Sequence, residues 1–229
     1  NHLLREIENR TLCPGVRALL LYPMNALAND QMLRIRALLK NFPNITFGRY
    51  IGETEKRYSD AREKYMKQFH EEPMKNELIS REQMWDTPPN ILLTNYAMLE
   101  YLLLRPGDSI FFDDINAKHW KYIVVDEAHT YKGAKGIEMA MLLRRLKDRI
   151  YSAGSKNLKC IATSATLGKG RDEFARIAEF ASQLFGEKFE WHDDEPEKQD
   201  IIEAERIPLC LSIDSWGKPD NSLYLKWNS

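Results

Sequence analysis

Short apolar runs alternate with amphipathic segments along most of the chain, and this alternation restricts the fold more than any other feature of the sequence. The apolar runs lack a polar face, as is typical of strands that are buried on both sides of a sheet. Five runs predict strands, at residues 16–23, 45–52, 90–95, 121–129 and 158–166. Four segments predict helices, at residues 26–41, 96–106, 136–150 and 171–186. We therefore expect an α/β fold, a mostly parallel sheet flanked by helices on both faces.

The spacing of apolar residues predicts which side of two helices is buried. In the helix at residues 26–41 the predicted apolar side consists of Leu27, Leu33, Leu38 and Leu39. In the helix at residues 136–150 the predicted stripe consists of Ile137, Met141, Leu142, Leu146 and Ile150. Gly186 is a predicted C-terminal cap for the helix that precedes it.

Polar motifs follow four of the predicted strands: YPMN, TNYAM, DEAH and TSAT. In a parallel sheet these motifs share one edge, at the carboxyl ends of the strands, where ligands bind. The motif DEAH places Asp126 and Glu127 directly after the apolar run YIVV. Charge at the end of a hydrophobic strand costs solvation energy, so the pair indicates that a cation binds there.

The composition is that of an ordinary soluble protein of 229 residues. Because 33 Lys and Arg face 34 Asp and Glu, the chain has no overall attraction for nucleic acid, and such a surface must be local. Three separated cysteines argue against disulfides and zinc and for a reducing compartment. No stretch is long enough for a membrane span and no signal peptide is visible, so we expect a cytoplasmic protein.

Two regions look peripheral. Residues 53–80 are dense in charge and predict a solvent-facing helical insertion. Residues 191–229 lose the alternation and gain acids and prolines, which predicts a linker with one edge strand at residues 206–211. We therefore assign residues 1–190 to one domain. Its first ten residues have helical spacing without a cap, so the chain is expected to be a fragment.

The two acids allow two interpretations. In phosphoryl-transfer enzymes an Asp in this position holds Mg²⁺ through water, and a neighbouring Glu orients the attacking water. Alternatively, both acids cap the next helix, where the macrodipole favours negative charge.

The order of the motifs resembles superfamily 2 helicases. DEAH after IVV and TSAT after KCIA are similar to motifs II and III, and YPMNALANDQ resembles motif Ia, with Met24 where Thr is common. YIGET and PPNILLTNYAMLEYLLLRP are similar to the motifs that follow. The chain resembles the first RecA-like domain of a DEAH-type helicase, in the form found in Mrf/Hrq-type DNA-repair and phage-defence helicases. The resemblance spans residues 16–186.

This resemblance implies a role for each matching residue. Asp126 would hold Mg²⁺ and Glu127 would activate water, with ATP and Mg²⁺ as cofactors. His129, Ser164 and Thr166 would couple the nucleotide to the nucleic acid. The strand-binding residues would be Pro23, Asn25, Ala26, Gln31, Gly52, Thr54, Thr94, Asn95 and Tyr96. The implied partners are nucleic acid, DNA rather than RNA, and a second RecA-like domain of the same polypeptide.

Structural roles stay open for several of these residues. Thr94 with Asn95, or Ser164 with Thr166, could be caps, and His129 could be an ordinary helix residue. Tyr96 and Met98 could belong to the core.

No GxxxxGK[ST] phosphate loop occurs in the sequence, and GKGRDE at residues 168–173 lacks its spacing. We therefore expect a RecA-like sheet that lacks the phosphate-loop strand, and a fragment that is inactive alone. The leading hypothesis is a fragment of an ATP-dependent DNA helicase or translocase in repair or defence. A non-catalytic nucleic-acid- or protein-binding module, and a duplex translocase subunit of a restriction or defence complex, are the alternatives.

Overall fold

The computed structural model describes residues 2–23, 25–164 and 171–203, and a six-stranded sheet forms the centre of this part. The strands are Ala18–Tyr22 (β1), Phe47–Arg49 (β2), Glu77–Leu78 (β3), Ile91–Asn95 (β4), Tyr122–Val125 (β5) and Lys159–Ala162 (β6). Their order is β3-β2-β4-β1-β5-β6, and each neighbouring pair is parallel. The predicted α/β fold with a parallel sheet is confirmed.

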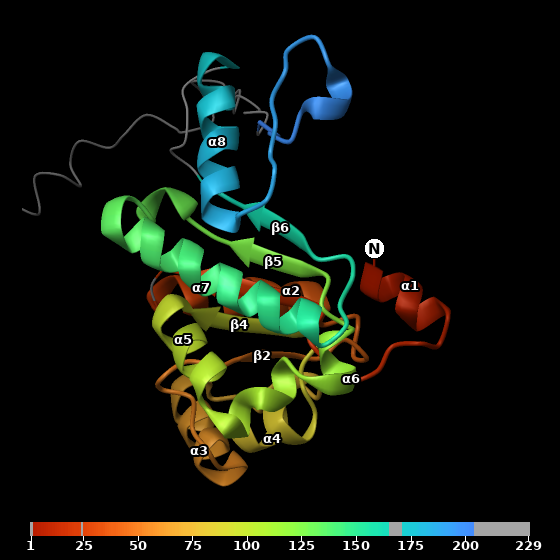
Figure 1. The fold of residues 1–229 in the computed structure, drawn as a ribbon. Helices are drawn as coiled ribbons and strands as arrows, with labels where there is room; N and C mark the ends of the chain where they lie inside the picture. The colour runs from red at the N-terminus through yellow and green to blue at the C-terminus, as the bar shows by residue number, and fades with distance from the viewer. Residues whose placement is uncertain (1, 24, 165–170, 204–229) are drawn as a thin grey trace, which may run out of the picture.

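Helices cover both faces of the sheet. They are His2–Glu8 (α1), Asn25–Leu39 (α2), Tyr58–Phe69 (α3), Arg81–Asp86 (α4), Tyr96–Leu104 (α5), Asp114–Ala117 (α6), Gly133–Ser152 (α7) and Phe174–Phe185 (α8). Short 3₁₀ turns lie at Pro106–Phe111, Ala128–Thr130, Arg171–Glu173 and Pro196–Lys198. Figure 1 shows α5 and α7 in front of the sheet and α2 behind it. The sheet is thus the middle layer of three.

The central strand β1 explains why the strands read as continuous apolar runs. Leu19 and Leu21 pack into the core on the α5 and α7 side, whereas Leu20 and Tyr22 pack on the α2 side with Met32. Because successive side chains of a strand point to opposite faces, a strand buried on both faces needs apolar residues at every position. Each fully buried leucine contributes about 1.5–3 kcal/mol of transfer free energy.

The predicted apolar stripes of α2 and α7 are partly wrong. Leu33 and Leu38 of α2 are 53% and 70% exposed, and Ile137 and Met141 of α7 are 68% and 58% exposed. The arc that each helix buries depends on its rotation against the sheet, which periodicity alone does not define when apolar residues lie on several sides. Four predicted residues are buried: Leu39 in α2 and Leu142, Leu146 and Ile150 in α7. Three residues outside the predicted stripes are buried as well: Met32 in α2 and Met139 and Leu143 in α7.

The charged insertion at residues 53–80 is not simply a solvated helix. It contains the predicted helix α3, but it also provides the edge strand β3, which pairs with β2. Glu77 of β3 is buried and pairs with Arg36 of α2 at 2.8 Å, while the hydroxyl of Tyr65 donates to the same carboxylate at 3.1 Å. A buried carboxylate needs such partners. The insertion is therefore part of the core at this end of the sheet.

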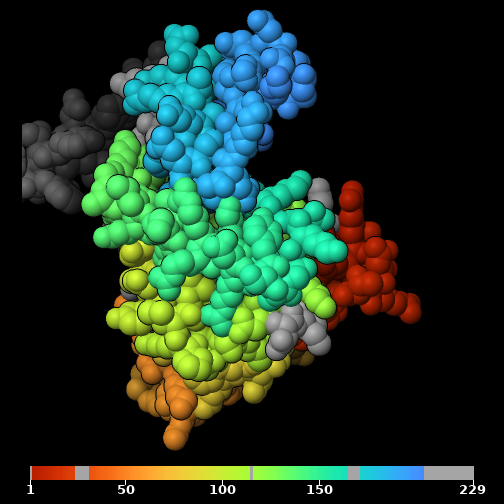
Figure 2. Space-filling view, in the orientation of Figure 1, coloured from red at the N-terminus to blue at the C-terminus, as the bar shows by residue number. Residues whose placement is uncertain are grey.

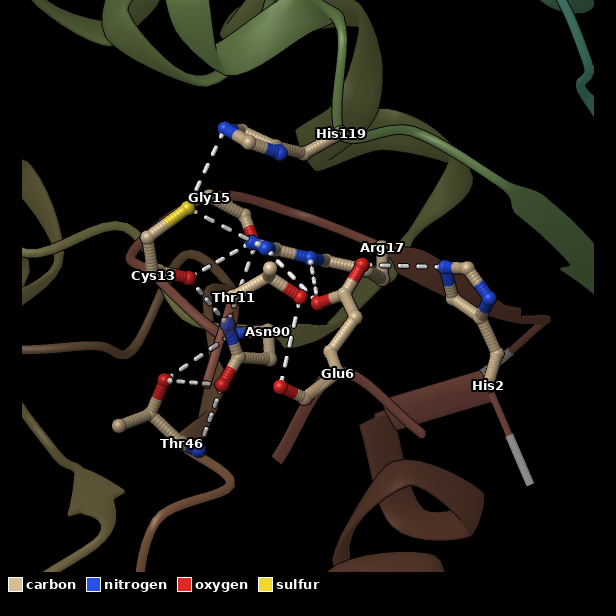
Figure 3. A network of polar contacts seen from close by, with 9 residues as sticks. All are labelled: His2, Glu6, Thr11, Cys13, Gly15, Arg17, Thr46, Asn90 and His119. Atoms are coloured by element: carbon tan, nitrogen blue, oxygen red, sulfur yellow. Dashed lines mark hydrogen bonds and ion pairs between the residues drawn. The ribbon is translucent and has the colours of Figure 1, made fainter. Parts of the chain in front are cut away.

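A buried arginine connects α1 to the amino end of β1 (Figure 3). The Arg17 guanidinium donates to the Glu6 carboxylate at 3.0 Å and to the carbonyls of Cys13 and Gly15, both at 2.7 Å. Asn90, which precedes β4, donates to the Cys13 carbonyl as well, at 3.0 Å. This network lies at the edge of the sheet opposite the carboxyl ends of the strands.

Residues 187–203 lie beside α8 at the end of the molecule opposite α3 (Figure 2). They contain one antiparallel bridge, between Trp191 and Gln199. The predicted edge strand at residues 206–211 lies outside the described residues, and the boundary at residue 190 stays a prediction. Among the described helices, none combines the length and the apolar character that a membrane span needs.

Candidate active site

The motifs that follow β1, β4, β5 and β6 gather at one edge of the sheet because all four strands are parallel and adjacent. β1 ends at Tyr22, β4 at Asn95, β5 at Val125 and β6 at Ala162. The shared edge that the sequence predicted is confirmed.

Asp126 is fixed by the two strands that flank β5. Its amide donates to the Leu21 carbonyl of β1 at 2.9 Å, and its carboxylate accepts a hydrogen bond from the Thr163 hydroxyl beyond β6. The Thr163 carbonyl in turn accepts from the Ala128 amide at 2.9 Å. Sequence reasoning missed Thr163, although its position one residue before Ser164, directly after a strand, is a usable signal.

Glu127 has a strained backbone. Its φ of 48° and ψ of 46° lie in the left-handed region, which non-glycine residues rarely occupy and which costs on the order of 1 kcal/mol or more. Its buried Oε2 lies 3.1 Å from Nδ1 of His129, yet it accepts no hydrogen bond within the described residues. A buried carboxylate oxygen that accepts no hydrogen bond, on a residue with a strained backbone, indicates a binding site for a ligand or an ion.

His129 connects the end of β5 with the end of β6. Its Nδ1 lies 3.0 Å from the Ser164 hydroxyl, within hydrogen-bond distance, and 3.1 Å from Glu127. The imidazole thus lies between the Ser164 hydroxyl and the Glu127 carboxylate. Thr166 lies outside the described residues, so four of the five predicted catalytic residues are brought together: Asp126, Glu127, His129 and Ser164.

Two buried tyrosines, Tyr22 and Tyr131, lie near Asp126. Burial raises the pKa of Tyr22 to about 12 and the pKa of Tyr131 to about 12, and the Asp126 carboxylate adds to both shifts. The Tyr131 hydroxyl is buried and has no hydrogen-bond partner in the described part of the chain. Both phenols are uncharged at neutral pH, so neither adds a charge beside Asp126.

Both predicted strand-binding threonines donate hydroxyl hydrogen bonds to backbone carbonyls within the protein. Thr54 is buried and donates to the Arg49 carbonyl at 2.9 Å, and Thr94 is fully buried and donates to the Tyr50 carbonyl at 2.6 Å. Their side chains shape the loops at this edge and do not reach the surface. Gly52, by contrast, is exposed.

Asn95 caps α5, because its side chain accepts from the Met98 amide at 2.7 Å. Tyr96 begins the helix, is partly exposed, and donates to the Glu138 carboxylate at 3.5 Å. Met98 is buried, as the core interpretation required. Asn95 is therefore the N-cap of α5, as one of the two interpretations of the sequence predicted. The N-terminus of α5 lies at this edge of the sheet.

The remaining strand-binding candidates lie between β1 and the second turn of α2. Pro23 follows β1 and Gln31 lies in α2, both partly buried. Asn25 and Ala26 begin α2, and their side chains lie outside the description.

The comparisons with known proteins agree with this architecture. Residues 2–174 match the family described as DEAD/DEAH box helicase, so the chain belongs to that family. Among its relatives, Druantia protein DruE of Escherichia coli (strain UMEA 4076-1) is 29% identical over 86% of this chain, which covers 16% of DruE. The ATP-dependent helicase hrq1 of Schizosaccharomyces pombe (strain 972 / ATCC 24843) is 27% identical over 66% of this chain, which covers 12% of hrq1.

Among solved structures, the DUF1998 helicase MrfA bound to DNA has a TM-score of 0.54 and 27% identity, over 80% of this chain and 20% of MrfA. The resemblance to the first RecA-like domain of Mrf/Hrq-type helicases is thereby confirmed. The chain spans less than a quarter of each of these relatives.

Proposed function

We propose that the full-length protein containing this chain is an ATP-dependent DNA helicase or translocase that acts in DNA repair or defence. The observation that carries the proposal is the set of contacts at one edge of the sheet: Glu127 contacts His129, His129 contacts Ser164, and Asp126, next to Glu127 in the chain, is held by Thr163. Two of the similar proteins support it by name: hrq1 is called an ATP-dependent helicase, and MrfA has been solved with DNA and AMPPNP.

The donor set fits a hard divalent cation. Asp126 offers carboxylate oxygen, and the next residue in the chain, Glu127, has an Oε2 that accepts no hydrogen bond within the described residues. Mg²⁺ is commonly bound by one or two carboxylates together with substrate phosphates and water. Asp126 would hold the ion, which when bound with ATP would neutralise negative charge on the terminal phosphate oxygens.

Each residue of the group then has a distinct task. Glu127 would accept a proton from the attacking water, a general-base role that is worth about 10²–10⁴ in rate. Its left-handed backbone would keep the carboxylate in place, and Thr163 would do the same for Asp126. His129 and Ser164 would transmit movement at the end of β6 to Glu127, and thus couple hydrolysis to the nucleic acid.

The nucleic acid would pass over the loops at the same edge. Pro23, Asn25, Ala26, Gln31, Gly52, Thr54, Thr94, Asn95 and Tyr96 remain the proposed strand-binding residues. Thr54, Thr94 and Asn95 would act by shaping loops and capping α5, since their side chains are used internally. Backbone amides and helix N-termini bind phosphates without reading bases, which suits a motor that moves from one phosphate to the next.

The proposal is tested with the full-length protein. Phosphate release is measured without nucleic acid, with single-stranded DNA and with single-stranded RNA. Strand displacement is then compared with triplex displacement, which separates a helicase from a duplex translocase. DNA-stimulated release is expected, and its absence under all conditions would refute the proposal. The 229-residue chain alone, which has no phosphate loop, is expected to release phosphate only at background rate.

A further inference from the structure

A thiol, an imidazole and a guanidinium meet at the edge of the sheet opposite the candidate active site (Figure 3). Sγ of Cys13 lies 3.4 Å from Nε2 of His119, and Nη2 of Arg17 donates to the same sulfur at 3.4 Å. Cys13 and Arg17 precede β1, whereas His119 precedes β5. We call these three residues the thiol cluster. The candidate active site uses none of them.

The surrounding chain keeps the thiol cluster in place. Gly15 has a φ of 131°, and a Cβ added to it would lie 2.8 Å from Cδ2 of His119, so the imidazole packs directly on a glycine. The guanidinium of Arg17 is held by the Cys13 carbonyl, to which it donates at 2.7 Å, and by the Glu6 carboxylate at 2.9 Å. The imidazole and the guanidinium are therefore already positioned beside the sulfur.

His119 is placed to take the proton of the thiol. Burial lowers the pKa of His119 below its ordinary value, and the charge of Arg17 adds to the lowering, so the imidazole is neutral at neutral pH. When its proton is on Nδ1, the neutral ring has a free electron pair on Nε2, the atom beside Sγ of Cys13. Cysteine reacts as the thiolate, and an adjacent base is one of the groups that activate it. Glu6 offsets part of the Arg17 charge, because it pairs with that guanidinium.

Cys13 also lines a cavity at the surface. The cavity has a volume of about 460 Å³ and lies between the end of α1 and the segments that precede β2 and β4. Among the described residues that line it, Arg10 alone is charged, and it is exposed. Cavities of roughly 300–1,000 Å³ hold small organic molecules, and a single cation in the wall favours an anionic one.

The two cysteines in the described part of the chain differ in access. Cys13 is partly exposed, whereas Cys160 is buried. Burial also raises the pKa of the Cys160 thiol to about 12, so this second thiol stays neutral and enclosed. Cys160 is therefore an internal reference for a thiol without an activating environment.

We propose that Cys13 is a modification site, at which the thiol cluster forms a mixed disulfide with a small anionic disulfide held in the adjacent cavity. The inference is independent of the proposed function, because no residue of the thiol cluster or of the cavity belongs to the candidate active site.

The reaction is a thiol–disulfide exchange. The Cys13 thiol gives its proton to Nε2 of His119, and the resulting thiolate attacks one sulfur of the bound disulfide. The sulfur–sulfur bond of the reagent breaks as the new bond to Cys13 forms, and the other half leaves with the electron pair as a thiolate, which takes up the proton from the imidazolium. The Cys13 sulfur is oxidised and the departing half is reduced, so no further oxidant is required.

The test uses the full-length protein and oxidised glutathione, a disulfide that carries carboxylates. The reaction is quenched with acid at intervals, and peptide mapping by mass spectrometry follows each cysteine. The Cys13 peptide is expected to gain one glutathionyl group about tenfold faster than a synthetic, unstructured peptide of residues 9–17. The Cys160 peptide should stay unmodified until denaturant is added, and dithiothreitol should reverse the modification of Cys13. A Cys13 rate no higher than that of the synthetic peptide would overturn the proposal.

Two variants test the parts of the site. His119→Gln removes the base and should lower the Cys13 rate about tenfold. Arg10→Gln should lower the rate with oxidised glutathione about threefold to fivefold, but should not lower the rate with cystamine, a cationic disulfide. Its control is Arg5→Gln, which removes the same charge from α1 outside the residues that line the cavity and should change neither rate.

Thermal unfolding of each variant shows whether it is folded. Because Arg10 is exposed, the comparison of Arg10→Gln with Arg5→Gln stays valid even if His119→Gln impairs folding. An unchanged rate in folded His119→Gln, or equal rates with oxidised glutathione in the two arginine variants, would contradict the proposal.

Discussion

Replacing Arg17 by methionine should destabilise the protein more than any exposed charge change in α1. Arg17 is 1% exposed in its side chain and pairs with Glu6 at 2.9 Å. Its guanidinium also satisfies the carbonyls of Cys13 and Gly15. Methionine keeps the apolar length of the side chain but supplies no donor, so a carboxylate and two carbonyls lose hydrogen bonds at once (Figure 3).

The size of the effect follows from burial. Removing one partner of a buried ion pair costs about 3–5 kcal/mol, since the other charge is left uncompensated. The Glu6 side chain keeps 16% exposure, and partial access to water places the expected loss in the lower half of that range, about 3–4 kcal/mol. For a domain of this size the melting temperature should fall by about 6–16 °C.

Urea unfolding followed by circular dichroism measures the loss. The control is Arg5→Met, which removes the same charge from an exposed position of α1 and should change stability by less than about 0.5 kcal/mol. A double-mutant cycle with Glu6→Gln should give a coupling energy of about 1–3 kcal/mol. A loss below about 1 kcal/mol for Arg17→Met, or no coupling, would refute the reasoning.

Three further predictions concern single residues. In the full-length protein, Glu127→Gln should lower ATP hydrolysis by about 10²–10⁴-fold with nucleotide affinity nearly unchanged, and full turnover in a phosphate-release assay would remove Glu127 from its role. Burial raises the pKa of Cys160 to about 12, so its thiol is neutral at pH 8. Peptide mapping after iodoacetamide treatment should find it unmodified until denaturant is added. Gly15→Ala should cost about 1–3 kcal/mol in urea unfolding, because φ is 131° and the new Cβ would lie 2.8 Å from His119. Gly107→Ala, with open space around it, should be nearly neutral.

The sequence predicted the core elements well where a strand is buried on both faces. The apolar runs around β1, β4 and β5 predicted strands, and the sequence placed the motifs after them at the correct edge of the sheet. Prediction failed for β3, because a strand of two residues inside a charged segment has no periodic signal. It also failed for the exposed faces of α2 and α7, where Leu38 and Met141 carry the right spacing but point to solvent.

The candidate site shows the same division. Asp126, Glu127, His129 and Ser164 were named from the order of the motifs. Thr163 was not, because it acts through a contact made across the fold rather than through neighbours in the chain.

By itself, the sequence determined the alternation of strands and helices, the parallel sheet and the edge at which the polar residues meet. These depend on local period and on strand direction, which short stretches of chain encode. Only the tertiary structure decided which helix face is buried, that Arg17 is enclosed, and that Thr163 binds Asp126. Those features depend on the distances between segments far apart in the chain, and packing defines such distances only when the whole core has formed.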